Sequence, residues 1–222
     1  MHSIWKSWEK SHSILRAKRA TKIKKIQMRH FQKQFLFFLG GIETKEEESY
    51  SKLRTSKVMY MNELLVPEAM RLSKKVEQVT RFKLKDDKYG SENFQVMNYR
   101  IGGRISAHLD SVGGHTKGTS EAEEVGGFRV TTFMVYMSDV EAGGRTIFPQ
   151  SGISVKPAEG KALFWYNVGT RSNFDSRIFH LGCPVIYGNK WIANKWIKLL
   201  PQFQKFPSWR RYLYFTTIDP YK

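Results

Sequence analysis

Cysteine is almost absent from this chain of 222 residues, since Cys183 is the single one. One cysteine excludes a disulfide within the chain and says little about the redox compartment. Long apolar runs are missing too. The longest candidate, Phe35–Leu39, is far shorter than the roughly 18 apolar residues of a membrane-spanning helix, and it favours a buried strand. No apolar segment follows the basic start, so no secretory signal peptide is visible.

Acidic residues are scarce beside basic ones. The chain has 20 Asp and Glu against 37 Lys and Arg, a net charge of +17. Residues 1–34 hold ten of the basic residues and one acid, Glu9, so about half of the charge lies in the least domain-like part. This distribution favours a solvated basic tail or an amphipathic helix. Nucleic-acid binding through this segment is the alternative hypothesis.

Aromatic residues, by contrast, make up 14% of the chain, which indicates a substantial core. The length suits one domain with an appendage. The shift in composition along the chain predicts three parts. These are a basic segment over 1–49, helical or disordered, a folded domain over 50–200 and a C-terminal tail over 201–222.

The apolar pattern predicts a helix followed by a sheet. Helical spacing favours a helix over Asn62–Thr80, with Pro67 in its first turn. From Phe94 onward, short strand-like segments are separated by turns, and Phe128–Met137 is the candidate for a central strand. The sequence therefore predicts a mainly β fold with flanking helices, and eight such strands fit a jelly roll with a mouth for a ligand.

A glycine-rich segment, Ser111–Gly127, interrupts this pattern. It has no apolar periodicity, and loops of this length in compact domains are often lids or binding loops. We expect it to contact the substrate together with Arg104 and Arg145 at the mouth. His115 within it reads as an exposed loop residue, not as a metal ligand.

Three side chains suggest a metal site. His108 and Asp110 are two residues apart on a predicted strand, so they would point to the same face, and His180 is a third candidate further on. Two histidines and one carboxylate leave the opposite coordination positions open, which is typical of non-heme Fe(II) oxygenases. A His-x-Asp tripeptide also arises by chance, so the assignment depends on its surroundings.

From about Arg54 to Lys198 the chain resembles the catalytic domain of the α subunit of collagen-type prolyl 4-hydroxylase. The resemblance covers roughly two thirds of the chain, with the motifs in the family's order and spacing. The matching pieces are RTSK at Arg54–Lys57, NYRIGG at Asn98–Gly103, the His108–Asp110 tripeptide, YMSDVEAGGRTIFP at Tyr136–Pro149, ALFWYN at Ala162–Asn167 and HLGCPVIYGNKWIANKW at His180–Trp196.

The resemblance implies a double-stranded β-helix, that is, a jelly-roll core flanked by helices. It implies Fe(II) bound by His108, Asp110 and His180, with 2-oxoglutarate and dioxygen as cosubstrates and ascorbate to keep the iron reduced. Lys190 would pair with the distal carboxylate of 2-oxoglutarate, since a buried carboxylate needs a charge partner. We expect the turn before Lys190 to fold its strand back beside the one after His180. Tyr99 and Thr132 match positions that hydrogen-bond the same carboxylate, although core packing is a rival reading for both.

The implied reaction is hydroxylation of peptidyl proline at C4, with 2-oxoglutarate decarboxylated to succinate and carbon dioxide. The implied substrate is a collagen-like peptide, the implied partner is protein disulfide isomerase, and the implied location is the lumen of the endoplasmic reticulum. Ile105-Ser106-Ala107 stands where the family has a Tyr-Glu-Pro type sequence. The family's upstream regions have no counterpart in residues 1–34.

Two alternatives stay open. The first is a related oxygenase acting on lysine or on nucleic acid. Nucleic-acid oxygenases generally hold 2-oxoglutarate through arginines, and Lys190 argues against them. The second is a catalytically degenerate subunit that binds a Pro-rich peptide or a protein partner without turnover. Its weakness is that all three ligands and Lys190 are present.

Overall fold

A computed structural model describes residues 47–50, 54–84, 90–110, 129–167, 176–199 and 202. The basic segment, except for its last residues, lies outside this part of the chain, as do Phe35–Leu39, His115 with its glycine-rich loop, and almost all of the predicted tail. Within the described residues, no helix is both long and apolar enough to cross a bilayer. The proposed domain boundaries stay predictions.

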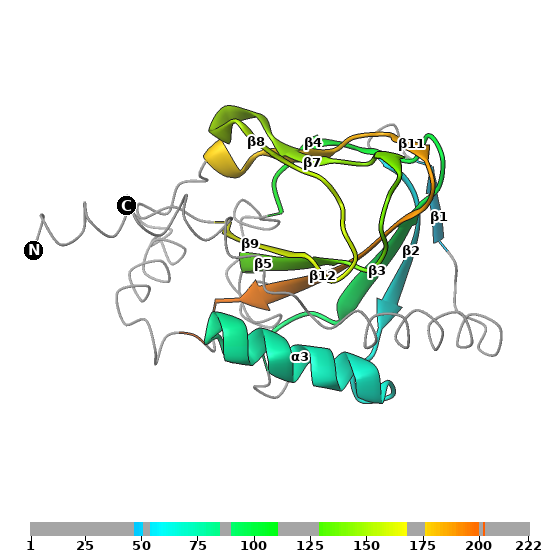
Figure 1. The fold of residues 1–222 in the computed structure, drawn as a ribbon. Helices are drawn as coiled ribbons and strands as arrows, with labels where there is room; N and C mark the ends of the chain where they lie inside the picture. Colours follow the sequence, from blue (N-terminus) through cyan, green and yellow to red (C-terminus); the bar gives the residue numbers. More distant parts are fainter. Residues whose placement is uncertain are drawn as a thin grey trace, which may run out of the picture.

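Two sheets face each other, and one helix covers the outer side of the larger sheet (Figure 1). The larger sheet has the order β1-β2-β3-β12-β5-β9 and the smaller has the order β4-β10-β7-β8, while β11 pairs with β6. All of these pairings are antiparallel. The strands are β1 (Glu47–Tyr50), β2 (Thr55–Met61), β3 (Phe94–Tyr99), β4 (Ile105–His108), β5 (Arg129–Tyr136), β6 (Ala142–Gly143), β7 (Thr146–Phe148), β8 (Ile153–Val155), β9 (Ala162–Tyr166), β10 (His180–Gly182), β11 (Val185–Tyr187) and β12 (Lys190–Lys198).

The predicted helix is shorter than expected. It is α3 (Pro67–Thr80), because Asn62 to Val66 form a turn and Val66 is extended, which suits the residue before a proline. It ends where Arg81 adopts a left-handed backbone with φ of 66° and its N–H reaches the Glu77 carbonyl at 2.8 Å. Two short 3-10 helices, η2 (Pro149–Ser151) and η3 (Ser176–Ile178), complete the described helices.

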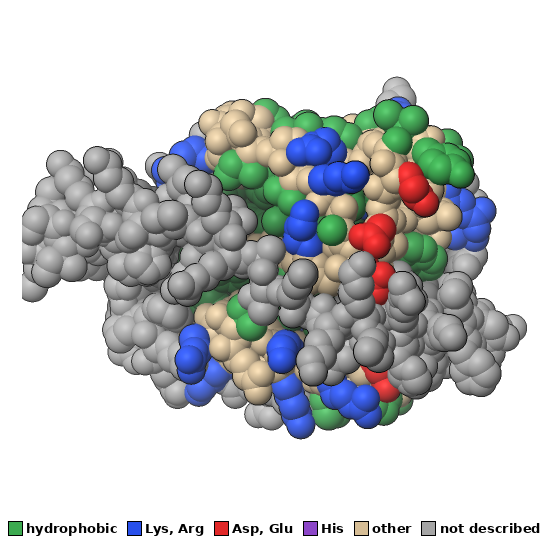
Figure 2. Space-filling model, in the orientation of Figure 1, with side chains coloured by type: hydrophobic (Ala, Val, Ile, Leu, Met, Phe, Trp, Pro, Cys, Tyr) green, Lys and Arg blue, Asp and Glu red, His purple; other side chains and the backbone are tan. Residues whose placement is uncertain are grey.

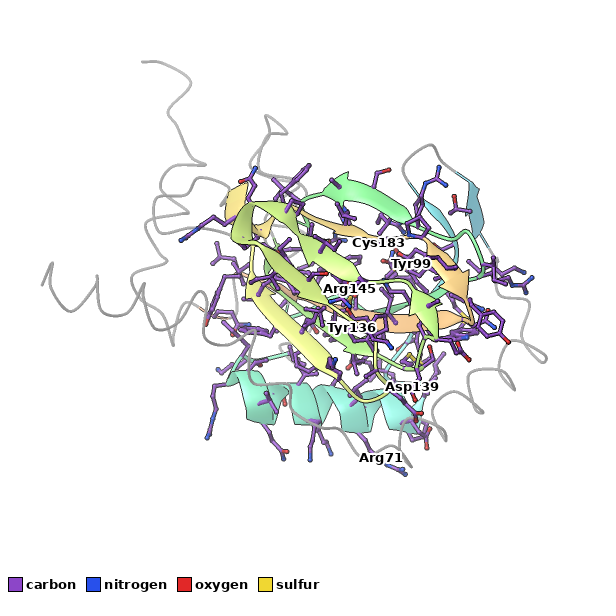
Figure 3. The ribbon with its side chains drawn as sticks, turned by 45° about the horizontal axis from the view of Figure 1, so that its top comes forward. Arg71, Tyr99, Tyr136, Asp139, Arg145 and Cys183 are labelled. Carbon is purple, nitrogen blue, oxygen red and sulfur yellow. The ribbon has the colours of Figure 1, made fainter. Side chains whose placement is uncertain are left out.

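The larger sheet is buried on both faces, which explains its long apolar strands. Its outer face packs against α3 through Ala69, Leu72 and Val76, whereas its inner face packs against the smaller sheet. Alternation along β5 sends Phe133 outward and Met134 inward. Figure 3 shows Arg71 on α3 directed away from the sheets, with Tyr99 and Tyr136 in the interior between them.

The double-stranded β-helix predicted for this chain is therefore confirmed, with β5 as a central strand. The prediction for the strand that starts at Lys190 was wrong. We expected it to lie beside the strand following His180, but β12 pairs with β3 and β5, while β10 and β11 belong to other sheets. The turn at Gly188, with φ of 94°, carries the chain from β11, paired with β6, to the larger sheet.

Candidate metal and cosubstrate site

The two histidines lie opposite each other on neighbouring strands of the smaller sheet. His108 ends β4 and His180 begins β10, and the antiparallel register places them directly opposite. Their ring centroids lie 4.3 Å apart. Strand pairing thus brings together two residues that are 72 positions apart in the sequence.

Asp110 joins them from outside the strand. The sequence predicted that it would share a strand face with His108, but β4 ends at His108 and Asp110 lies in the bend that follows. Its two carboxylate oxygens lie 3.5 Å from His108 Nε2 and 3.9 Å from His180 Nε2. The grouping was predicted, whereas the geometric reason given for it was wrong.

Backbone carbonyls fix the tautomer of both histidines. The Nδ1 of His108 lies 2.8 Å from the Ser106 oxygen, and the Nδ1 of His180 lies 2.9 Å from the Ile178 oxygen. A carbonyl only accepts hydrogen bonds, so each Nδ1 carries the proton. Each Nε2 is then left with a free lone pair on the side of Asp110, as a metal ligand requires.

Asp110 is a buried anion held by neighbours. Its residue is 3% exposed, and burial by itself would raise its pKa. The two histidines beside it and the hydroxyl of Thr132, which donates to Oδ2 at 2.7 Å, outweigh burial and lower the pKa to about 2. The carboxylate is therefore ionised at neutral pH.

Aromatic side chains enclose His180. Phe148 stacks on its ring at 5.3 Å, and Trp165 meets the ring edge-on at 4.9 Å. Burial in this wall lowers the pKa of His180, so its neutral form, the one that binds metals, is favoured. His108, Asp110 and His180 together offer ligand atoms within 4.8 Å of one another, and this donor set fits a divalent iron.

A second set of contacts holds the backbone of Asp110. Arg129 makes a bidentate pair with Glu92, at 2.6 and 2.7 Å, and its guanidinium carbon lies 3.5 Å from the centroid of the Trp196 ring. The remaining nitrogen donates to the Asp110 carbonyl at 3.4 Å. The Arg129 guanidinium binds both Glu92 oxygens and stacks on the Trp196 ring, so its position is fixed, and it holds the Asp110 backbone in place.

Lys190 is a buried cation on the inner face of the larger sheet. It begins β12 opposite Tyr99, is 2% exposed, and its Nζ lies 5.3 Å from the centroid of the Tyr99 ring. No carboxylate among the described residues pairs with it. Burial lowers its pKa to about 8, and the nearby Cys183 raises it in part. An added Cβ at Gly182 would lie 2.9 Å from the Ile105 Cγ2, so the neighbouring strand β10 packs closely against β4 at this glycine.

Three hydroxyl groups lie near Lys190 or toward the metal ligands. The Tyr99 hydroxyl contacts the Met97 sulfur at 3.4 Å, and burial raises the pKa of Tyr99 to about 12. Tyr136, whose ring is 5.9 Å from the Lys190 Nζ, donates to the Thr146 hydroxyl at 2.7 Å. Thr132 instead uses its hydroxyl on Asp110. Its expected bond to the cosubstrate, like the cosubstrate roles of Tyr99 and Lys190, stays a prediction.

One cavity of about 220 Å³ joins these groups. His108, Asp110 and His180 line it, as do Tyr99, Thr146 and Lys190. The cavity therefore contains a carboxylate and two imidazoles in one part and a buried ammonium in another. Such an arrangement can hold a small dianion between a metal and a cation.

The sequence did not reveal several residues of this site. Asn167, Thr146 and Arg129 were not assigned roles, and Arg145, expected at the mouth, donates to the side chain and carbonyl of Ser154 at 2.7 and 2.9 Å. Period-2 alternation from Thr132 would place Arg129, three residues away, on the outer face, so it could not have found this residue. The pairing of β5 with β12 shifts register beside Arg129, between Ile197 and Lys198, and no local pattern indicates such a shift. Asn167 stands at the end of an apolar segment, where a polar residue gives no clear signal of a buried role.

Residues 94–198 match the sequence profile of the 2OG-Fe(II) oxygenase superfamily. The chain is 38% identical over 145 residues to the prolyl 4-hydroxylase subunit alpha-1 of Gallus gallus, which is 65% of this chain and 27% of that protein. It is 37% identical over 153 residues to subunit alpha-3 of Homo sapiens. The chain thus spans about a quarter of the length of the curated relatives that it matches.

Solved structures share the fold. The viral collagen prolyl hydroxylase of Paramecium Bursaria Chlorella virus-1, solved with 2OG, has a TM-score of 0.60 at 24% identity, covering 79% of this chain and 91% of that one. A prolyl hydroxylase of Trichoplax adhaerens, in complex with a peptide fragment of hypoxia inducible factor, has a TM-score of 0.59 at 16% identity, covering 89% and 93%.

Proposed function

We propose that this chain hydroxylates peptidyl proline with Fe(II), dioxygen and 2-oxoglutarate. The ground is that residues 94–198 match the 2OG-Fe(II) oxygenase superfamily and that the chain is similar to prolyl 4-hydroxylase α subunits. The products would be 4-hydroxyproline, succinate and carbon dioxide. The observation that carries the proposal is the single cavity that contains both a two-histidine, one-carboxylate set and a buried lysine with no described carboxylate partner.

The metal would be held by His108 Nε2, His180 Nε2 and the Asp110 carboxylate. When bound, iron supplies the activation of dioxygen and the oxidation of the cosubstrate and the C–H bond. The chain's own contribution is binding and orientation. Asp110 provides the negative charge that a dication needs, and the Phe148–Trp165 wall keeps water from His180.

The distal carboxylate of 2-oxoglutarate would lie beside Lys190. Burial deprives the ammonium of solvating water and lowers the pKa of Lys190. A carboxylate beside it would stabilise the charged form and so return that pKa toward its ordinary value. The hydroxyls of Tyr99 and Thr146 line the same cavity and can donate to a carboxylate oxygen. Two hydroxyls and a cation at this end favour a dicarboxylate over a keto acid with an apolar end.

The peptide would enter along β12, away from Lys190. Gln95 and Asn194 are register partners four residues from Tyr99 and Lys190, which is about 13 Å along the strands. The buried Gln95 Oε1, Asn194 Oδ1 and Trp196 Nε1 line the cavity and have no hydrogen-bond partner among the described residues. Unpaired buried donors and acceptors are costly unless a ligand satisfies them, and a peptide backbone offers both kinds. Asn194→Ala should therefore raise the KM for peptide several-fold more than the KM for 2-oxoglutarate.

The test of the proposal is succinate release by the purified chain with Fe(II), 2-oxoglutarate and ascorbate, with and without a (Pro-Pro-Gly) repeat peptide. We expect peptide-stimulated succinate, with a matching gain of one oxygen atom on the peptide by mass spectrometry. No succinate under either condition from a folded chain would support the catalytically degenerate subunit instead. Need for ascorbate, assembly with protein disulfide isomerase and residence in the endoplasmic reticulum are parts of the proposal that rest on the resemblance.

Basic residues offer little support for a nucleic-acid substrate. On the face drawn in Figure 2, Lys and Arg side chains are scattered and do not form one continuous patch. Binding to the phosphate backbone would need clustered positive charge.

A further inference from the structure

We propose that Thr132 and Asn167 form a positioning pair that orients the Asp110 carboxylate for the metal, an inference that rests on the proposed metal site. Neither side chain touches the place where the metal would bind through an atom of its own. They act through Asp110, whose carboxylate accepts a hydrogen bond from the Thr132 hydroxyl.

The hydrogen bonds of the pair run in one direction. The Asn167 amide donates to the Thr132 oxygen at 2.9 Å, and the Thr132 hydroxyl donates to Asp110 Oδ2 at 2.7 Å. The Thr132 hydroxyl has a single proton, and the contact with Asp110 is shorter than the 3.3 Å to the Asn167 carbonyl oxygen. One donor is thus committed to one carboxylate oxygen, which leaves Oδ1 without a bond from this pair.

The pair is itself held rigidly. Both residues have no exposed surface, and Thr132 is β-branched, with few side-chain rotamers. It lies on central strand β5 between Trp165 of β9 and Trp196 of β12, its register partners on the two sides. The backbone N–H of Asn167 donates to the Val130 carbonyl at 2.8 Å, which fixes Asn167 beside the same strand.

Asp110 needs this support more than the other ligands do. His108 and His180 are register partners within a sheet, and carbonyl oxygens bind both of their Nδ1 atoms. Asp110 lies beyond the end of β4, where no strand pairing holds it, and Arg129 reaches only its backbone carbonyl. The larger sheet therefore supplies, through Thr132, the orientation that the smaller sheet gives to the histidines.

The probe is Mn(II), counted by the electron paramagnetic resonance signal of the free ion, so that the readout is binding and does not depend on turnover. Thr132→Val keeps the shape and removes the donor, and it should weaken Mn(II) binding by roughly 10- to 100-fold, as is usual when a group that orients a ligand is lost. Thr132→Ser restores a hydroxyl and should bind Mn(II) close to the wild type.

The matched control is Thr131→Val. Thr131 is the neighbouring residue, equally buried, on the opposite face of β5, and its hydroxyl has no hydrogen-bond partner in the part of the chain that the structure describes. The same chemical change should there leave Mn(II) binding within about twofold, since no contact to a metal ligand is lost. Circular dichroism of each variant confirms that it is folded.

Asn167→Ala should weaken binding less than Thr132→Val, and the double variant should be no weaker than Thr132→Val, because Asn167 acts through Thr132. A folded Thr132→Val that binds Mn(II) as the wild type does, or a Thr131→Val that loses as much, would overturn the inference. If Thr132→Val does not fold, wild-type binding by Asn167→Ala would overturn it too. Failure of the wild type to bind Mn(II) would contradict the proposed metal site instead.

Discussion

Strand β12 carries two buried lysines, five residues apart and on opposite faces. Lys195 faces the outer core, where its ammonium contacts the Glu63 carboxylate and donates to the Glu92 carbonyl at 2.6 Å. Lys190 faces the cavity, where the described residues offer it aromatic rings and no carboxylate. The two side chains are 1% and 2% exposed, so burial does not distinguish them.

The difference lies in where the counter-charge comes from. Desolvating an ammonium is expensive, and a chain that does so without an anion of its own has a reason outside its own packing. Lys195 has a structural role, because its counter-charge is the Glu63 carboxylate of the same chain. We propose that the anion for Lys190 arrives with a ligand, and that this ligand also binds a metal at His108, Asp110 and His180 in the same cavity.

The largest effect should follow loss of the metal. His180→Ala removes one of two imidazole donors and should lower turnover by roughly a thousandfold or more, since the reaction has no other route to activate dioxygen. The check is succinate release at saturating Fe(II) and 2-oxoglutarate. Full activity in this variant would show that His180 is not a ligand of the catalytic metal, and the cavity that contains Lys190 would then not be the metal site.

Lys195→Met tests the structural side of the comparison. It leaves the Glu63 carboxylate, which also receives a hydrogen bond from Ser73, without its cation. Because Glu63 is 13% exposed, we expect a loss of about 3 kcal/mol in the free energy of unfolding, toward the low end for a broken buried pair. Urea denaturation measures it, and an unchanged midpoint would contradict the assignment.

Lys190→Met tests the functional side. It should raise the 2-oxoglutarate KM by roughly 100-fold, because truncating one partner of a buried charge pair costs a few kcal/mol. The same variant should leave the free chain as stable as the wild type or more so, since it removes an uncompensated buried charge. Destabilisation as large as that of Lys195→Met would make the two lysines equivalent.

The pH dependence should distinguish Lys190 as well. Its folded pKa of about 8 is below its ordinary value, so above pH 8 the free site is neutral and must regain a proton to bind a dianion. The 2-oxoglutarate KM should therefore rise above pH 8, by up to about tenfold per pH unit.

The free energy of unfolding of the free chain should increase with pH between about 8 and the pKa of this lysine in the unfolded chain. In that range the unfolded chain binds a proton at Lys190 that the folded chain does not. Lys190→Arg should remove the slope in KM.

Tyr99→Phe should have the smallest effect. In the free chain its hydroxyl contacts the Met97 sulfur at 3.4 Å, and its pKa of about 12 keeps it a donor at every working pH. A hydrogen bond to a charged carboxylate is worth about 1.5 kcal/mol at the low end, so the KM for 2-oxoglutarate should rise by about tenfold. An unchanged KM would place Tyr99 in packing alone.

Short-range pattern was enough to predict part of this site. Alternation and turn residues gave the central strand over β5, and the motifs gave His108, Asp110, His180 and Lys190, which the structure gathers around one cavity. The rest depends on which strands pair. β12 lies between β3 and β5, and the Thr132 hydroxyl reaches Asp110. Both features depend on contacts between segments that are far apart in the sequence.

Strand ends were the other weak point. Asp110 was placed on the strand of His108 because the two are two residues apart, yet β4 ends at His108, two residues before Asp110. Backbone hydrogen bonding to a distant strand, not local spacing, decides where a short strand ends. Asn167 was missed for a related reason, since a polar residue at a strand end is more often a solvated turn than a buried donor.

The central claim is that Lys190 and the metal ligands bind the two ends of one cosubstrate. The most direct test is calorimetric titration of the Mn(II)-loaded chain with 2-oxoglutarate and with 2-oxopentanoate, which carries a methyl group in place of the distal carboxylate. We expect the wild type to prefer 2-oxoglutarate by roughly 100-fold, and Lys190→Met to lose most of that preference. Equal discrimination by both proteins would contradict the claim, because the distal carboxylate would then be recognised elsewhere.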